Sequence, residues 1–266
     1  MKLAKPLNEY IDHTLLKPGA TRTEFETLLD EAIKYQFASV CVPPFMAVAI
    51  KKTLEREGSE VKVCTVVDFP HGHLPLALKL TQALALAEAG IHEIDWVLNY
   101  ANLKNGMFDN VGVEIENMGK QLSDLGAVTK CIIETCYLNE EEKTFMWKAL
   151  SEHTGVDYIK TSTGFGPEGA QLVDVLNWNA LREAEDFGLD SGGLIQLTPI
   201  VGPRGSPLKI KAAGGIRDLD TALKFIGCGA DRLGMSASVE VMEEYNVRQS
   251  TFTEEEETGI QEEYNG

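Results

Sequence analysis

The sequence alternates between strand-like and helix-like segments eight times over about 250 residues, and this alternation constrains the fold more than any other feature. Strands that alternate with helices are joined by right-handed crossovers into a parallel sheet. Eight such units in 266 residues fit a closed barrel, so we predict an α/β fold, a single-domain (β/α)8 TIM barrel. The predicted strands are residues 10–14, 38–42, 61–68, 93–99, 128–134, 157–161, 208–213 and 231–234. The predicted helices are residues 23–35, 46–57, 74–88, 110–122, 140–151, 172–186, 218–226 and 238–245.

A doubly wound open sheet is the alternative fold. It would place a Gly-x-Gly-x-x-Gly phosphate loop directly after the first strand, and the sequence has no such loop there. The segment 186–208 is rich in glycine and proline and is long for a helix-to-strand connection. In a barrel it leads into the seventh strand from the bottom, so we expect it to lie away from the chemistry. We assign residues 1–245 to the catalytic barrel and residues 246–266 to an acidic tail, solvated or disordered.

Charge and composition exclude several classes of protein. The net charge of −17 argues against nucleic-acid binding, because phosphate contacts need lysine and arginine. No apolar run reaches the length of a membrane span and the N-terminus is too polar for a secretion signal, so we expect a cytoplasmic protein without membrane contact. The five cysteines match no zinc site and are interpreted as buried free thiols. His71 and His73 lack a third metal ligand and are interpreted as part of a polar rim at the barrel mouth.

Several charged side chains are predicted to point into the barrel. Side chains alternate along a strand, so the apolar face should pack on the outer helices while the other face turns inward. A single inward charge is explained as well by an internal ion pair or by a side chain that reaches solvent at the strand end. Barrel interiors are normally branched aliphatic, however, so charges from four consecutive strands together indicate a site. The inward-facing residues of the fourth to seventh strands are Asp95, Lys130, Glu134, Lys160, Lys209 and Lys211.

Two of these lysines suggest a specific chemistry. Lys160 and Lys211 lie on consecutive predicted strands, so their backbones should be about 5 Å apart. If two ammonium groups approach within about 6 Å at an effective dielectric near 20, they repel by about 3 kcal/mol, which equals roughly two pKa units. One amine would then be uncharged often enough to attack a carbonyl and form a Schiff base. We therefore predict Lys160 as the nucleophile, Lys211 as the residue that keeps it uncharged, and Asp95 as a proton shuttle.

Glycines and hydroxyls after the last three predicted strands suggest an anion site. Each set can open a helix N-terminus whose free N–H groups bind phosphate, and barrels often build phosphate sites from these loops. Each glycine alone is explained by a tight turn, but three sets on adjacent strands favour a site. The sets are Gly164 after the sixth strand, Gly214 and Gly215 after the seventh, and Gly234 with Ser236 after the eighth.

At these residues the sequence resembles the deoxyribose-phosphate aldolases, a family of class I, Schiff-base-forming aldolases with a (β/α)8 barrel. The resemblance covers nearly everything from residue 11 to about residue 242. It implies reversible cleavage of 2-deoxy-D-ribose 5-phosphate to acetaldehyde and D-glyceraldehyde 3-phosphate, with no cofactor and no metal, by a homodimer. The segments that carry it are I-D-H-T-L-L-K-P, A-S-V-C-V-P-P, V-C-T-V-V-D-F-P-H-G, E-I-D-W-V-L-N, K-C-I-I-E-T-C-Y-L, D-Y-I-K-T-S-T-G-F-G, K-A-A-G-G-I-R and R-L-G-M-S-A-S.

The resemblance also implies roles for individual residues. Lys160 is similar to the Schiff-base lysine of the family and Lys211 to the second lysine that lowers its pKa. Asp95 is similar to the acid/base aspartate that works through a water. Contacts to the substrate or its phosphate are implied for Asp12, Cys41, Thr163, Gly164, Gly214, Gly215 and Ser236.

Three residues depart from the family pattern. Ala237 stands where many relatives have a second serine, so one hydroxyl of the phosphate site is lost. Tyr264 is near the end of the chain but is not the last residue, and Lys209 has no counterpart in the pattern. Two other functions stay open: a Schiff-base aldolase of another phosphorylated sugar, and a non-catalytic barrel that binds a phospho-sugar.

Overall fold

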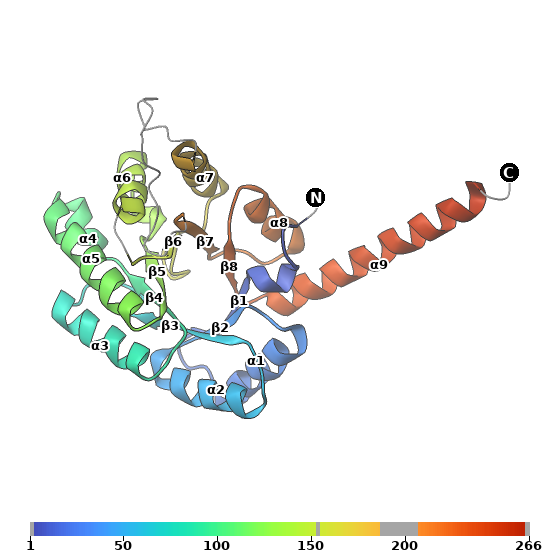
Figure 1. Ribbon diagram of the computed structural model, residues 1–266, viewed down its shortest axis with the longest axis horizontal. Coiled ribbons are helices and arrows are strands. Elements are labelled where there is room, and N and C mark those ends of the chain that lie inside the picture. Colours follow the sequence, from blue (N-terminus) through green and yellow to red (C-terminus); the bar gives the residue numbers. More distant parts are fainter. Residues whose placement is uncertain (1–2, 153–154, 187–206, 264–266) are drawn as a thin grey trace.

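Eight parallel strands form a closed barrel in the computed structural model, in the order β1 to β8 with β1 paired to β8 (Figure 1). The structure describes residues 3–152, 155–186 and 207–263. The TIM barrel prediction is confirmed, and closure of the sheet excludes the open-sheet alternative. The strands are β1 Ile11–Thr14, β2 Ser39–Val42, β3 Lys62–Val67, β4 Glu93–Val97, β5 Val128–Ile132, β6 Tyr158–Lys160, β7 Lys209–Ala213 and β8 Arg232–Met235.

Helices surround the barrel, and several begin where the sequence supplies a capping residue. Thr21 and Glu24 form a capping box at the start of α1. Asn139 accepts a hydrogen bond from the Glu142 N–H at the start of α6, 2.8 Å long. The helices are α1 Arg22–Tyr35, α2 Pro44–Arg56, α3 Leu76–Glu88, α4 Tyr100–Lys104, α5 Phe108–Asp124, α6 Glu140–Glu152, α7 Leu172–Asp186, α8 Leu219–Gly227 and α9 Ser238–Glu263, with short 3-10 helices η1 Leu7–Tyr10 and η2 Thr135–Tyr137.

The C-terminal helix is longer than the sequence prediction. α9 continues past residue 245 to Glu263, and Figure 1 shows its end projecting away from the barrel. The extension is rich in glutamate and contains no proline, which is compatible with a helix. The predicted helix end was therefore wrong, while the assignment of residues 246–266 to a separate acidic tail stays a prediction. Most of the segment 186–208, and Tyr264, lie outside the described residues.

The alternation of side chains on β4 follows the prediction. Ile94, Trp96 and Leu98 belong to the hydrophobic core between the barrel and its helices, while Asp95 is fully buried on the opposite side, within the barrel. The barrel therefore directs polar side chains of its strands into a closed interior.

Within the described residues, none of the helices combines the length and the apolar character that crossing a membrane requires.

Candidate active site

The barrel interior holds seven charged side chains, which we call the lumen cluster. Strand register brings them together, because Asp95 on β4 pairs with Lys130 on β5. In the same way Lys160 on β6 pairs with Lys211 on β7. The strands that close the barrel, β1 and β8, add one acidic and one basic residue. The members are Asp12, Glu93, Asp95, Lys130, Lys160, Lys211 and Arg232.

Asp95 is at the centre of this cluster. Its Oδ2 accepts hydrogen bonds from Lys160 Nζ and from Lys211 Nζ, each 2.7 Å long. Its Oδ1 accepts from Lys130 Nζ at 2.7 Å. The nitrogens of Lys160 and Lys211 therefore lie no farther apart than twice 2.7 Å. The structure thus brings together the three residues for which the sequence predicted catalytic roles.

The electrostatics of the lysine pair differ from the prediction of direct repulsion. A carboxylate oxygen that both lysines share screens their charges from each other. Burial alone would lower the pKa of Lys211, but Asp12 and Asp95 raise it above its ordinary value. Burial would likewise raise the pKa of Asp95, but Lys130, Lys160 and Lys211 hold it well below its ordinary value. Lys211 is therefore an ammonium ion and Asp95 a carboxylate at neutral pH.

The charge balance of the lumen cluster singles out Lys160. Four basic side chains face three carboxylates, so one basic group lacks a full counter-charge. Lys211 pairs with Asp12 at 2.5 Å as well as with Asp95, and Lys130 pairs with Glu93 at 2.6 Å as well as with Asp95. Among the carboxylates of the described residues, Lys160 forms an ion pair with Asp95 alone. Lys160 is therefore the lysine of the lumen cluster with the fewest carboxylate partners.

A cavity of about 310 Å³ opens above the lumen cluster at the carboxyl ends of the strands. Of the three lysines in the cluster, only Lys160 lines it. Gly164, Gly214 and Gly215 have positive φ angles of 84°, 86° and 83°, which only glycine adopts without strain. The predicted substrate and phosphate residues that line the cavity are Thr163, Gly164, Gly214, Gly215 and Ser236.

Two basic residues at this cavity were not singled out from the sequence. Lys17 follows β1 and Arg217 follows the Gly214-Gly215 pair, and both side chains line the cavity. The signal was present, because Lys17 ends the motif I-D-H-T-L-L-K and Arg217 ends K-A-A-G-G-I-R. With Ser236 just before the start of α9, these residues give the cavity several groups that suit an anion.

Asp12 and Cys41 do not line the cavity, although the sequence predicted substrate contacts for both. Asp12 is fully buried and contacts Lys211, Arg232 and Ser39. Cys41 is buried beside Cys64, its partner in the register of β2 and β3. Asp12 therefore reaches the reaction only through Lys211 in this state, and its contact with sugar hydroxyls stays a prediction.

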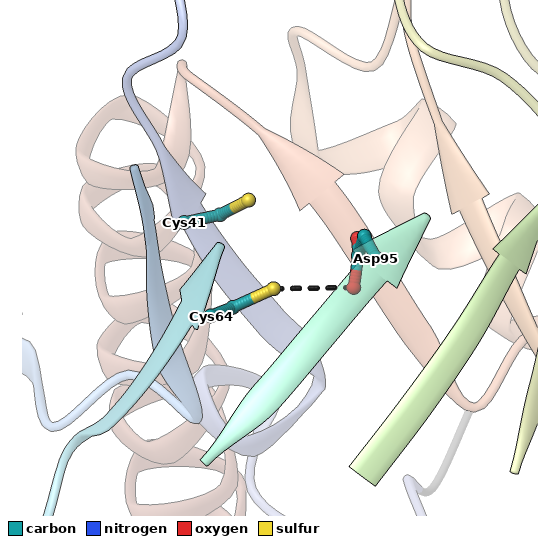
Figure 2. Close-up of side chains that lie close together, drawn as sticks. All are labelled: Cys41, Cys64 and Asp95. Atoms are coloured by element: carbon teal, nitrogen blue, oxygen red, sulfur yellow. Dashed lines mark hydrogen bonds between the residues drawn. The ribbon is translucent and has the colours of Figure 1, made fainter. Parts of the chain in front are cut away.

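Cys41, Cys64 and Asp95 lie close enough to form a metal-ligating group, with ligand atoms within 4.8 Å of one another (Figure 2). Asp12, Cys64 and Glu93 form a second such group. The Lys130 ammonium already contacts members of both groups: it lies 3.3 Å from Cys64 Sγ, 2.7 Å from Asp95 Oδ1 and 2.6 Å from Glu93 Oε2. Burial also raises the pKa of Cys64 well above its ordinary value, which keeps it a thiol. The donor atoms serve a lysine, so this set does not suit a metal ion.

Four other residues singled out from the sequence are not members of the lumen cluster. Lys209 is exposed at the start of β7, and its Nζ lies 5.6 Å from the centroid of the Tyr158 ring, which Arg232 of the lumen cluster also approaches. Its position at the lower end of the lumen stays a prediction. His71 and His73 stack on each other with ring centroids 5.7 Å apart, in an exposed loop after β3. Ala237 lies between Ser236 and the start of α9.

Comparisons with known proteins give a consistent result. No family model matches the chain. The deoxyribose-phosphate aldolase of Thermococcus gammatolerans is 41% identical over 235 residues, which are 88% of this chain and 94% of that protein. A solved structure described as QR15, an aldolase, superposes with a TM-score of 0.77 at 32% identity, covering 92% of this chain and 98% of that one. The deoxyribose phosphate aldolase from Aeropyrum pernix, described as a tetramer, superposes with a TM-score of 0.74 at 32% identity, covering 90% and 91%.

Proposed function

The chain belongs to the deoxyribose-phosphate aldolase family, a family of carbon–carbon lyases, and we propose that Lys160 is its Schiff-base nucleophile. The reaction is the reversible cleavage of 2-deoxy-D-ribose 5-phosphate to acetaldehyde and D-glyceraldehyde 3-phosphate. One observation carries the assignment of Lys160: among the lysines of the lumen cluster it alone lines the cavity, and it has the fewest carboxylate partners.

The free amine of Lys160 arises from the excess positive charge of the lumen cluster. Lys211 and Lys130 share Asp95 with Lys160, so the single carboxylate that stabilises the Lys160 ammonium is divided among three lysines. Loss of one proton from Lys160 leaves three cations for three carboxylates. Lys211 thus acts through competition for Asp95 and through its own charge, rather than by direct repulsion alone.

In the direction of cleavage, the Lys160 amine attacks the aldehyde carbon of the open-chain sugar and forms a carbinolamine. Loss of water gives an iminium ion, and a base removes the proton of the C3 hydroxyl. The bond between C2 and C3 breaks, its electron pair moves to the iminium to form an enamine, and glyceraldehyde 3-phosphate leaves. Protonation of the enamine carbon and hydrolysis then release acetaldehyde and the amine.

Asp95 and Lys211 are the groups that handle protons in this scheme. Asp95 is a carboxylate in contact with both lysines, so it is suited to accept a proton, directly or through a water, close to the iminium. Lys211 is held as an ammonium ion by Asp12 and Asp95, so it can donate a proton or stabilise a developing oxyanion. No step requires another electron acceptor, because the iminium serves that role.

The phosphate of the substrate is assigned to the other end of the cavity. Gly164, Gly214 and Gly215 bring backbone close to the cavity, and Ser236 adds a hydroxyl before α9. Arg217 adds positive charge, whereas the Lys17 ammonium at the cavity edge is paired with Glu24. A ligand bound in this way extends from the phosphate-binding residues in the loops after β6, β7 and β8 to Lys160 below.

Incubation with acetaldehyde and borohydride, followed by peptide mapping, tests the proposal. We expect a reduced two-carbon adduct on Lys160 and no adduct in K160L. A non-catalytic binding barrel would bind the phospho-sugar and give no adduct. A panel of donor substrates separates the other alternative, since an aldolase of another sugar would use hydroxyacetone or dihydroxyacetone phosphate and give no product with acetaldehyde.

We further propose that the protein is a cytoplasmic homodimer and that residues 246–266 form an acidic tail outside the barrel domain. The relative from Aeropyrum pernix is described as a tetramer, so the assembly differs within the family or is larger here. Light scattering coupled to size-exclusion chromatography gives the mass and decides between dimer and tetramer.

A further inference from the structure

Glu134 is a buried acidic residue at the barrel mouth that the proposed reaction does not use. It follows β5, at the carboxyl end of the barrel, and only 2% of its surface is exposed. Its backbone is left-handed, with φ 53° and ψ 68°. Residues with a β-carbon seldom adopt this conformation, and when they do the surrounding structure holds them there. Both features call for a function that a small or neutral residue would not provide.

The carboxylate of Glu134 binds the loop that follows β6. Its Oε2 accepts a hydrogen bond from the Thr163 hydroxyl at 2.5 Å, and the Thr163 N–H lies 3.3 Å from both carboxylate oxygens. The Thr163 hydroxyl oxygen in turn accepts from the Phe165 N–H at 3.0 Å. In the part of the chain that the structure describes, the carboxylate forms no ion pair. Its charge is therefore balanced by hydrogen-bond donors of this loop.

Close packing fixes the loop further. A β-carbon on Gly166 would lie 3.2 Å from Glu134 Oε1 and 2.9 Å from Cys136 Sγ. The loop thus approaches Glu134 and Cys136 so closely that a larger residue at 166 would displace one of these side chains. Farther along, the Ala170 N–H donates to the Ala213 and Gly214 carbonyls, which ties the loop to the end of β7.

The residues held in this way form one wall of the cavity. Thr163, Gly164 and Phe165 line it together with the glycines after β7. The Thr163 hydroxyl donates a hydrogen bond to Glu134 and accepts one from the Phe165 N–H. It therefore has no proton left to donate to the substrate. The predicted substrate contact of Thr163 is therefore better explained as support for its neighbours.

We propose that Glu134 is a positioning residue that shapes the phosphate-binding half of the cavity by holding Thr163 and, through it, the loop 163–166. This inference rests on the proposed function, because it assigns the phosphate to that loop. It distinguishes the two ends of the substrate: loss of Glu134 should impair recognition of the phosphate and leave the amine chemistry of Lys160 intact.

The test compares E134A and the wild type on 2-deoxy-D-ribose 5-phosphate and on unphosphorylated 2-deoxy-D-ribose. For the phosphorylated sugar we expect kcat/KM to fall about tenfold or more, mainly through KM. The reason is that the buried hydroxyl and N–H of Thr163 lose the Glu134 carboxylate that accepts their hydrogen bonds. For the unphosphorylated sugar we expect a change of less than about twofold. An equal loss with both sugars, or no loss with either, would overturn the inference.

Matched variants make the result independent of a folding defect. E134Q keeps one carbonyl oxygen for the Thr163 hydroxyl, so it should show the same selective loss at roughly one third of the size. If E134A does not fold, the ratio of the two sugars in E134Q decides. E141A changes an exposed glutamate in the first turn of α6 and should act on neither sugar.

A further measurement on the same samples separates this inference from the proposed function. Borohydride trapping with acetaldehyde involves no phosphate, so E134A should label Lys160 at the wild-type rate. Absence of labelling in the wild type would refute the proposed function. Normal labelling of both proteins, with equal kinetic losses on the two sugars, would refute the role of Glu134 alone.

Discussion

Two clusters of buried charge lie on opposite faces of β4, and they differ in charge balance. The lumen cluster includes Asp95 and holds four basic groups against three carboxylates. The second, which we call the outer cluster, consists of Lys79, Asp68 and Glu114 and holds one basic group against two carboxylates. Lys79 also lies 5.9 Å from the ring of Trp96, the residue next to Asp95.

In the outer cluster the lysine is fully paired with carboxylates and lies away from the cavity. Lys79 Nζ lies 2.5 Å from Glu114 Oε1 and 3.2 Å from Asp68 Oδ2, and it donates to the Val97 carbonyl at 2.7 Å. Asp68 in turn accepts from the Leu74 N–H, which fixes the loop after β3. Neither Lys79 nor its carboxylates line the cavity. Under the proposed function, the buried lysine that lacks a full counter-charge and reaches a cavity supports chemistry, whereas the buried lysine with neither property supports structure.

The largest effect is expected from removing the cation that competes for Asp95. In K211L three cations face three carboxylates, so the excess charge that favours the free amine of Lys160 is gone. We expect turnover of 2-deoxy-D-ribose 5-phosphate to fall about 10²- to 10⁴-fold, the usual range for loss of an acid/base group. Borohydride trapping on Lys160 should be slow at neutral pH and recover partly as the pH rises, since alkali then supplies the free amine.

K209L is the matched control, because Lys209 lies on the same strand but is exposed outside the lumen cluster. It should trap acetaldehyde and turn over substrate within about twofold of the wild type. Trapping by K211L that is as fast as in the wild type at neutral pH would show that Lys211 does not control the protonation of Lys160.

The next largest effect is expected on stability. In K79M two buried carboxylates, Asp68 and Glu114, lose the one lysine that pairs with them among the described residues, so we expect the free energy of unfolding to fall by about 3 kcal/mol. Denaturant unfolding followed by circular dichroism measures this change. At temperatures where K79M is folded, trapping on Lys160 should keep its wild-type pH dependence, because the outer cluster takes no part in the chemistry.

Lys104 offers the exposed counterpart. It pairs with Glu142 at 2.9 Å, but 43% of its side chain is accessible to solvent. K104M should therefore change the free energy of unfolding by less than about 1 kcal/mol. Equal losses in K79M and K104M would mean that burial adds nothing to the contribution of the outer cluster.

Much of the lumen cluster could be predicted because it depends on two simple periodicities. Alternation of strands and helices gives the barrel, and alternation of side chains turns Asp95, Lys160 and Lys211 inward. What could not be predicted was the path of each long side chain. That one oxygen of Asp95 serves both lysines depends on rotamers, which strand register does not determine.

The outer cluster and the role of Glu134 were missed for different reasons. Lys79 lies in the helical spacing of Ala83 and Leu86, both on the buried face of α3, so its position was a usable signal. Strand alternation placed Glu134 on the inward face, but its left-handed backbone is one that sequence patterns assign to glycine or asparagine, so its conformation could not be predicted. Its partner, Thr163, becomes a neighbour only when β5 and β6 are side by side.

The smallest expected effect is on the pH dependence of stability. The stability contributed by Glu114 should be lost as the pH rises, and that contributed by Asp95 should be lost as the pH falls. Burial raises the pKa of Glu114 above its ordinary value, although Lys79 acts against it. The folded protein therefore holds this proton more firmly than the unfolded chain, and the stability contributed by Glu114 is lost as the pH rises through the folded pKa. Gln lacks this titration, so the stability of E114Q relative to the wild type should increase as the pH rises above the ordinary glutamate pKa of about 4.3.

Asp95 provides the contrast, because the lumen lysines hold its pKa well below the ordinary value. Its contribution is complete above the unfolded pKa of about 4 and is lost only as the pH falls through the lower folded value. The stability difference between D95N and the wild type should therefore be flat over the interval in which that of E114Q rises. Urea unfolding at several pH values measures both. Parallel curves for the two variants would show that the clusters titrate alike. Charge balance could then not explain why Lys160 is proposed to be catalytic while Lys79 is structural.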